Sequence, residues 1–315
     1  MKAQELAKGL ADNIEKVITG KREKIIIILC ALFSGGNVLL EDVPGTGKTM
    51  LARSLAASAD IAFKRIQFTP DLLPSDLTGI TYFNPKDSEF VFRQGAVFTN
   101  LLLADEINRA TPRTQAALLE AMEEQQVTVD GKTYTLQTPF FVIATQNPIE
   151  SQGTYPLPEA QLDRFALKLS LGYPTLNEYI NILNNHGSGN PLTELQSICT
   201  GADILSAVAE CEKVYVHPDL MKYMAELAQA SRKYEGIALG LSTRGILSLM
   251  KCSKAYAAIQ GRNFVTPEDI KYIFPYAACH RLILSGSYRH RDSYAAKAIE
   301  DILALVSVPE EGWSL

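Results

Sequence analysis

The sequence is poor in the residues that build disulfide frameworks and metal sites. Its 315 residues include only five cysteines, which are Cys30, Cys199, Cys211, Cys252 and Cys279, and no C-x-x-C pair. The four histidines are scattered and show no metal-ligand spacing. These absences disfavour disulfides and zinc. Buried or free thiols predict a reducing, cytoplasmic location.

Long apolar runs are also missing. The longest, IIIILCALF at 25–33, has nine residues, whereas a membrane-spanning helix needs about 20. This run predicts a buried helix that ends at Gly35 and Gly36. The first residues, MKAQELAKGLADNIEK, have a polar helical pattern and no signal-peptide core. We therefore expect no membrane span.

Neither sign of charge is in large excess. The net charge is −5, with 47% hydrophobic and 21% charged residues, which is ordinary globular composition. The acidic balance makes a nucleic-acid partner unlikely on electrostatic grounds. The basic group Arg289-His290-Arg291 is interpreted as a solvated face.

Short apolar runs alternate with helical patterns in the first 175 residues. The expected strands are 37–41, 63–68, 101–105, 140–145 and 167–171. Several are continuously apolar, as in a parallel sheet with helices on both faces. Segments 80–92 and 126–136 predict two inserted hairpins, the second around Asp130-Gly131.

The composition changes at NNHGSGNPL, residues 184–192, which predicts a domain boundary. We expect an α/β domain over 1–189 and a small all-helical domain over 190–315. Helical patterns cover 201–215, 218–235, 243–260 and 266–284. Thr266-Pro267-Glu268-Asp269 is a strong helix start.

The most informative stretch is VLLEDVPGTGKT at 38–49, which has most of the phosphate-loop pattern G-x-x-x-x-G-K-[ST]. The backbone N–H groups of this loop and the start of the following helix favour the binding of phosphate oxygens. Lys48 is expected to reach the outer phosphates and the Thr49 hydroxyl to bind Mg²⁺. The expected nucleotide-binding residues are Pro44, Gly45, Thr46, Gly47, Lys48, Thr49 and Met50.

One position departs from the generic pattern, because Asp42 replaces its first glycine. A carboxylate beside a triphosphate is unfavourable unless it points away or accepts hydrogen bonds. We therefore expect Asp42 to do one or the other.

Two further apolar runs end in polar residues. LLLAD is followed by Glu106, so Asp105 and Glu106 should lie where ligands bind in open α/β sheets. Asp105 is a candidate Mg²⁺ ligand, and Glu106 a candidate base for an attacking water. FFVIAT leads to Gln146 and Asn147, which alone predict only an Asn-Pro turn. The sequence N-P-I-E there disfavours a GTPase, whose family uses N-K-x-D.

The chain resembles MoxR-type ATPases of the AAA+ superfamily over nearly its full length. The resemblance is carried by LEDVPGTGKT, LLLADEINRATPRTQAALLEAMEEQQVTV, FFVIATQNPIESQGTYPLPEAQLDRF and STRGILSLMKCSKAYAAIQGRNFVTPEDI. Asp42 is similar to what this family carries there. The family pattern also implies both inserted hairpins.

The resemblance implies roles for individual residues. Asn147 resembles sensor 1, and Arg244 resembles sensor 2, which would touch the γ-phosphate of its own subunit. Arg164 resembles the arginine finger, which would reach the ATP of a neighbour. Ile18-Thr19-Gly20 resembles the segment that lies against adenine. From the residues alone, Arg164 and Arg244 fit ordinary surface ion pairs.

Some assignments stay open on the sequence. Arg109 and Arg113 are rival finger candidates. The hairpin aromatics Tyr82, Phe83, Phe90 and Phe92 fit either a pore lining that grips a client or a face packed on the core. Packing is favoured, because aromatics on strands usually pack.

We expect an Mg²⁺-dependent ATPase that, by resemblance, forms a ring, most simply a homo-hexamer. The resemblance suggests a chaperone-like role and a client with a von Willebrand factor A domain. The alternatives are a magnesium-chelatase-like motor subunit, a nucleic-acid motor and a small-molecule kinase that shares the phosphate loop.

Overall fold

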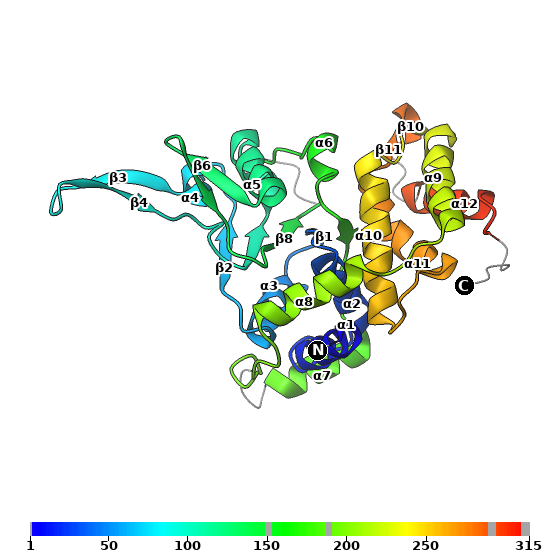
Figure 1. Ribbon diagram of the computed structural model, residues 1–315, viewed down its shortest axis with the longest axis horizontal. Coiled ribbons are helices and arrows are strands. Elements are labelled where there is room, and N and C mark those ends of the chain that lie inside the picture. Colours follow the sequence, from blue (N-terminus) through cyan, green and yellow to red (C-terminus); the bar gives the residue numbers. More distant parts are fainter. Residues whose placement is uncertain (1, 149–152, 187–190, 289–293, 310–315) are drawn as a thin grey trace.

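The centre of the molecule is a five-stranded parallel sheet, shown in Figure 1. The computed structural model describes residues 2–148, 153–186, 191–288 and 294–309. The strands in spatial order are β2 (Phe63–Gln67), β5 (Leu101–Asp105), β8 (Phe141–Gln146), β1 (Val38–Glu41) and β9 (Leu167–Leu169). The predicted parallel sheet is confirmed. We call its two rims the carboxyl edge and the amino edge, after the strand ends that lie there.

Alternating side chains give the sheet two hydrophobic faces. Leu101, Leu103 and Ile143 lie in one core cluster, whereas Leu102 and Val142 lie in the other. The first face is covered by α1 (Ala3–Glu15), α2 (Arg22–Phe33) and α3 (Lys48–Ser58), and the second by α4 (Pro74–Thr78) and α5 (Pro112–Glu124). Helices thus cover both faces, and the apolar run at 25–33 forms a buried helix, as predicted.

Two hairpins interrupt this α/β core, as the sequence predicts. They are β3 (Ile80–Asn84) with β4 (Glu89–Arg93), and β6 (Gln126–Val129) with β7 (Lys132–Thr135). Asp130 and Gly131 both have positive φ, 50° and 76°, as the predicted primed turn requires. The β3–β4 hairpin extends far from the sheet (Figure 1).

The hairpin aromatics divide into two groups. Phe92 stacks on Tyr134 of the second hairpin, with ring centroids 4.0 Å apart. Tyr82, Phe83 and Phe90 are instead 45%, 51% and 75% exposed. The prediction that these aromatics pack on the core is therefore confirmed for Phe92 and wrong for the other three. The hairpin projects from the α/β core, so no other element in the described part of the chain covers them.

The C-terminal part is mainly helical. Its helices are α8 (Gly201–Glu212), α9 (Pro218–Lys233), α10 (Thr243–Ile259), α11 (Pro267–Ala278) and α12 (Tyr294–Leu305), with the 3-10 turn η2 (Gly286–Tyr288). The capping box at Thr266 is present, and its backbone N–H donates to Asp269 at 2.8 Å. The prediction that this last helical segment continues to residue 284 is wrong, because α11 ends at Ala278. Beyond it, β11 (Ile283–Leu284) pairs with β10 (Ile237–Leu239), a short pair the sequence did not indicate.

The two parts of the chain share buried surface. Helix α8 packs against α1 and α2, and one hydrophobic cluster runs from α1 through α11. Residues 187–190, at the predicted boundary, and the basic group 289–291 lie outside the described residues. The boundary at 189/190 stays a prediction.

No helix in the described part of the chain is long and apolar enough to cross a bilayer. Within the same ranges, no group of three or more His, Cys, Asp or Glu side chains is placed to hold a metal ion. All five cysteines are free thiols.

Candidate nucleotide site

The phosphate-loop pattern forms a turn between β1 and α3 at the carboxyl edge. Gly45 and Gly47 have φ of 85° and 89°, in the left-handed region that favours glycine. A Cβ at Gly45 would meet no atom within 4 Å, so the loop is open on that side. Lys48, the first residue of α3, donates from Nζ to the Asp42 carbonyl at 2.9 Å. These features make a cradle of backbone N–H groups at a helix start.

Asp42 is a hydrogen-bond acceptor, one of the two arrangements expected for it. Its carboxylate accepts from Ser170 Oγ at 2.5 Å and from the backbone N–H groups of Leu171 and Gly172 at 2.8 and 3.0 Å. It is 5% exposed. Asp42 therefore ties the phosphate loop to the chain after β9, and its charge is balanced by hydrogen bonds instead of facing phosphate.

Asp105 ends β5 and is held on both oxygens. Thr145 Oγ1 donates to Oδ1 at 2.6 Å. Arg65, on the neighbouring strand β2, reaches Oδ2 with Nη2 at 2.7 Å and Nε at 3.2 Å. The carboxylate is thus fixed at the carboxyl edge beside the phosphate loop, where the sequence predicts it.

Glu106 follows in a left-handed conformation, with φ 55°. Its N–H donates to Thr145 Oγ1 at 2.8 Å, so one hydroxyl orients both acidic residues. Its Oε2 accepts from Gln67 Nε2 at 2.7 Å and lies 3.1 Å from Arg109 Nε. Arg109 therefore pairs with the glutamate of its own site, which weakens its claim as a finger for a neighbour.

The other residues predicted to contact the nucleotide at this edge are Asn147, Ile18 and Gly20. Asn147 is buried directly after β8, and its carbonyl accepts from Asn108 Nδ2 at 3.4 Å. Ile18 lies beside the loop, since its Cδ1 would be 3.5 Å from a Cβ at Gly47. Gly20 has φ 77°, and a Cβ there would collide with Glu178. The 18–20 segment is thus packed between the phosphate loop and α7 (Leu176–His186).

The residues at the carboxyl edge fit a magnesium nucleotide. The open glycine loop and Lys48 suit phosphate oxygens, and hydroxyl and carboxylate oxygens are the donors that Mg²⁺ prefers. Thr49 and Asp105 would hold the ion. Asp105 Oδ1 accepts one hydrogen bond, from Thr145, and keeps a further lone pair, whereas Oδ2 accepts two, both from Arg65.

Arg164 and Arg244 lie elsewhere, at the amino edge. Arg164 Nη1 is 3.2 Å from Glu123 Oε2, and Arg244 Nη2 bonds the other oxygen of the same carboxylate. Together they line a cavity of about 310 Å³ with residues 35–37, which precede β1. The phosphate loop follows the carboxyl end of β1. The four residues of this strand separate the loop from residues 35–37 by about 13 Å.

This placement corrects one expectation. The structure does not bring Arg244 to the phosphate loop of its own chain, where sensor 2 was expected to touch the γ-phosphate. The physical reason is the position of α10, whose first turn docks beside the 163–166 segment before β9. Arg113, the other rival finger, is exposed in the first turn of α5.

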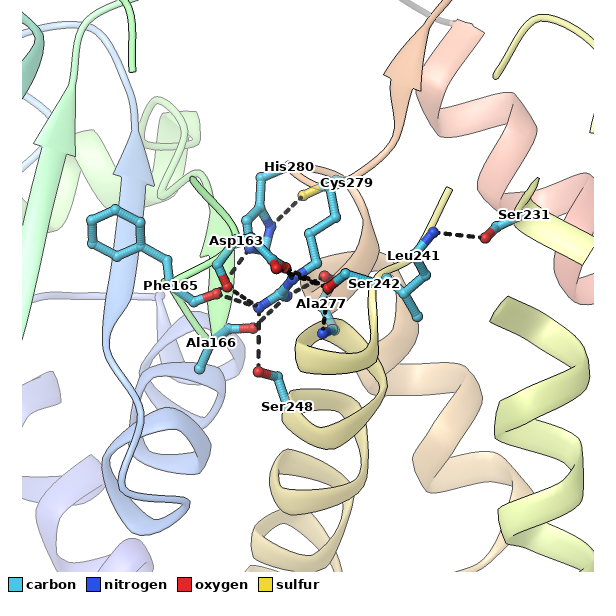
Figure 2. Close-up of polar contacts among 12 residues, drawn as sticks. Asp163, Phe165, Ala166, Ser231, Leu241, Ser242, Ser248, Ala277, Cys279 and His280 are labelled. Atoms are coloured by element: carbon cyan, nitrogen blue, oxygen red, sulfur yellow. Dashed lines mark hydrogen bonds and ion pairs between the residues drawn. The ribbon is translucent and has the colours of Figure 1, made fainter. Parts of the chain in front are cut away.

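Figure 2 shows how the C-terminal helices hold that segment. Ser242 Oγ donates to the Asp163 carboxylate and caps α10 by accepting from Gly245 N. His280, 6% exposed, lies 3.0 Å through Nε2 from the Phe165 carbonyl. Burial, with the adjacent Arg281 charge second, holds the pKa of His280 well below its ordinary value. The ring is therefore neutral and donates from Nε2.

Sequence reasoning missed four residues that shape these sites. Arg65 and Gln67 alternate with the apolar Ile66 and Phe68 near the end of the strand at 63–68, and this polar spacing is a usable signal. Thr145, next to the end of β8, is a weaker one. Glu123 lies in the polar run EEQQ and carries no signal, because its importance depends on two arginines distant in sequence.

The sheet order, the glycine loop and the acidic pair define a P-loop nucleotide-binding protein of the AAA+ type. Residues 37–167 match the family described as "ATPase family associated with various cellular activities (AAA)", and residues 229–302 match "AAA lid domain".

Close relatives extend this likeness over the whole chain. It is 47% identical over 298 residues to "Uncharacterized protein YeaC" of Bacillus subtilis, covering 95% of this chain and 93% of the relative. It is 37% identical over 307 residues to "Chaperone MoxR1" of Mycobacterium tuberculosis, covering 95% and 81%. A crystal structure from Cytophaga hutchinsonii, assigned as an ATPase, superposes with a TM-score of 0.91 at 39% identity, covering 98% and 96%. The chain belongs to the MoxR family of AAA+ ATPases.

The buried neutral His280 predicts a pH-dependent stability. The unfolded chain binds a proton near pH 6.5, whereas the folded chain does not, so the free energy of unfolding should fall as pH drops below that value. We expect a slope of up to about 1.4 kcal/mol per pH unit between pH 6.5 and 5, measured by urea unfolding.

His280→Gln, which retains an N–H donor, should flatten that slope. The matched control is His217→Gln, at the start of α9, which should keep the wild-type slope. Equal slopes for wild type and His280→Gln would show that the folded protein protonates His280 as readily as the unfolded chain.

Proposed function

We propose that this chain hydrolyses ATP with Mg²⁺ as one subunit of a ring, and that hydrolysis remodels or matures a client protein. The observation that carries the proposal is the division of polar groups between two edges of one sheet. Lys48, Asp105 and Glu106 lie at the carboxyl edge, whereas Arg164 and Arg244 lie at the amino edge. The two arginines are therefore available to a nucleotide held by a neighbour.

The carboxyl edge supports the hydrolytic half of the site. Lys48 and the loop N–H groups bind the phosphates, and Glu106 accepts a proton from the attacking water. Gln67 and Arg109 hold Glu106 in place. Mg²⁺, held by Thr49 and Asp105, neutralises charge on the phosphate oxygens when bound. In this proposal Asn147 senses the γ-phosphate, and Ile18 and Gly20 line the adenine.

The amino edge supports the assembly. An arginine supplied in trans stabilises charge that develops on the transferred phosphoryl group. Arg164 and Arg244 point their guanidinium groups at one carboxylate, so a phosphate of the next subunit that replaced Glu123 would meet both. This geometry favours a ring. The family resemblance makes a hexamer the first candidate.

The exposed β3–β4 hairpin supports a protein client. Tyr82, Phe83 and Phe90 present apolar surface at the far end of a projecting element, and Phe83 and Phe90 pack edge-to-face, 5.4 Å apart. Exposed aromatic groups of this kind mark protein-interaction sites. "Chaperone MoxR1" among the relatives fits such a role. The resemblance suggests a client with a von Willebrand factor A domain.

The alternative functions are less well supported. A small-molecule kinase needs no glutamate beside its Mg²⁺-binding aspartate, and Glu106 is held at that position by three residues. The net charge of −5 disfavours a nucleic-acid motor. A magnesium-chelatase-like motor subunit would also present hairpins to a protein partner, and the captured client distinguishes it.

Replacing the proposed base should separate binding from hydrolysis. Glu106→Gln should lower the ATP turnover number by at least about 100-fold, because it removes general-base catalysis, while ATP binding stays within about threefold, because Lys48 and the loop are untouched. Phosphate release and calorimetry measure the two effects. Glu124→Gln on α5 is the control and should turn over normally; normal turnover by Glu106→Gln would remove the base assignment.

Mixed rings test whether the arginines act across an interface. Arg164→Ala or Arg244→Ala, each inactive alone, should regain activity when mixed with Glu106→Gln, because intact bases then face intact arginines. The control partner is the double variant Arg164→Ala/Glu106→Gln, which should restore nothing. No recovery at any ratio, with rings intact by light scattering, would point to Arg109 or Arg113.

The hairpin aromatics should matter for the client and not for turnover. Phe83→Ser with Phe90→Ser should leave basal ATPase within about twofold, because both rings are solvent-exposed. The same changes in a Glu106→Gln background should abolish retention of the client in affinity purification. Glu89→Gln, on the same hairpin, is the control. Undiminished client retention would assign the aromatics no role in binding.

A further inference from the structure

A third arginine, Arg281, is buried and bonds residues close in sequence to both arginines that the proposed function assigns to the neighbouring nucleotide. It is 5% exposed and follows α11 in the C-terminal part. A charge this deeply buried is costly unless its hydrogen bonds are satisfied. All three of its guanidinium nitrogens are in fact engaged, and their partners identify what the residue holds.

On the side of the sheet, Arg281 binds the residues that flank Arg164. Its Nε donates to Asp163 Oδ1 at 2.6 Å. Its Nη2 donates to the carbonyls of Asp163 and Phe165 at 2.9 and 2.7 Å, and Nη1 to the carbonyl of Ala166 at 3.1 Å. The backbone is therefore fixed immediately before and after Arg164. Figure 2 shows Asp163, Phe165 and Ala166 converging on this point.

On the side of the C-terminal helices, Arg281 and Asp163 together hold the start of α10, which carries Arg244. Arg281 Nη2 donates to Ser248 Oγ at 3.2 Å, and Nη1 to the Ala277 carbonyl. Asp163 accepts from Ser242 Oγ at 2.8 and 2.9 Å, and Ser242 in turn caps α10. One ion pair thus joins the backbone of Arg164 to the helix of Arg244.

We propose that Arg281 is a positioning residue for the trans arginines, holding Arg164 and Arg244 as one rigid unit through Asp163. The inference rests on the proposed function, in which both arginines serve the ATP of the next subunit. Any movement of α10 and α11 then carries both together. Because a small misplacement of a catalytic group costs about 100-fold in rate, the joint placement controls the neighbour's turnover.

Lysine cannot replace Arg281 in this role. Its ammonium is a single point with three donors, whereas the contacts require a planar fork that reaches carbonyls on both sides of Arg164. Arg262 provides a matched comparison, because it forms a similar bidentate pair with Asp269, at 2.7 and 2.6 Å, wholly within the C-terminal part. Arg262 does not contact residues 163–166 in any bond described.

The test uses Arg281→Lys in the full-length protein, with Arg262→Lys as control. We expect Arg281→Lys to lower the turnover number by about 10- to 100-fold with little change in KM for ATP, because its own phosphate loop is intact. Mixed with Glu106→Gln, it should regain activity as Arg164→Ala does, because the partner supplies correctly placed arginines. General destabilisation would not be rescued in this way. Asp163→Asn, which keeps the shape of the side chain, provides a second variant with the same expected rescue.

Three results would overturn the inference. One is near-normal turnover by Arg281→Lys and Asp163→Asn. Another is a turnover loss in both that Glu106→Gln does not restore, although it restores Arg164→Ala in intact rings. Failure of every mixture, Arg164→Ala included, would overturn the trans assignment itself and the inference with it. Near-wild-type turnover by Arg262→Lys is expected throughout.

Discussion

The direction of the strands decides where the phosphate loop, the acidic pair and Arg164 lie. In a parallel sheet all carboxyl ends share one rim and all amino ends share the other. The phosphate loop, Asp105 and Glu106 follow strands and gather at the first rim, whereas Arg164 precedes β9 and lies at the second. A subunit built this way has the phosphate loop at one rim and guanidinium groups at the other, so its two rims differ in charge before any partner binds.

Buried polar groups then fix each rim internally. At the carboxyl edge, Thr145 orients both acidic residues, and Asp42 anchors the loop to the chain after β9. At the amino edge, the pair of Asp163 and Arg281 joins the sheet to the C-terminal helices. Each group is costly to bury alone and is stable only in its network. Each network therefore restricts movement within its own rim.

Local sequence patterns predicted the sheet, both hairpins, most helices and the phosphate loop, because apolar periodicity and turn propensity depend on residues that are close in sequence. They failed where long-range packing decides. The helix expected to reach residue 284 ends at Ala278, since the chain turns to pair with β10. The edge occupied by Arg244, and the importance of Glu123 and Arg281, depend on how α10 docks, which no short window encodes.

Glu123 gives the assembly a particular energetic character. It already holds Arg164 and Arg244 partly out of water, each against one oxygen of the same carboxylate. In the proposed ring, an arriving phosphate would exchange one anion for another instead of stripping solvent from two free cations. Glu123 and the neighbour's phosphate therefore compete for the same two arginines, and Glu123 can pair with them again once the phosphate leaves.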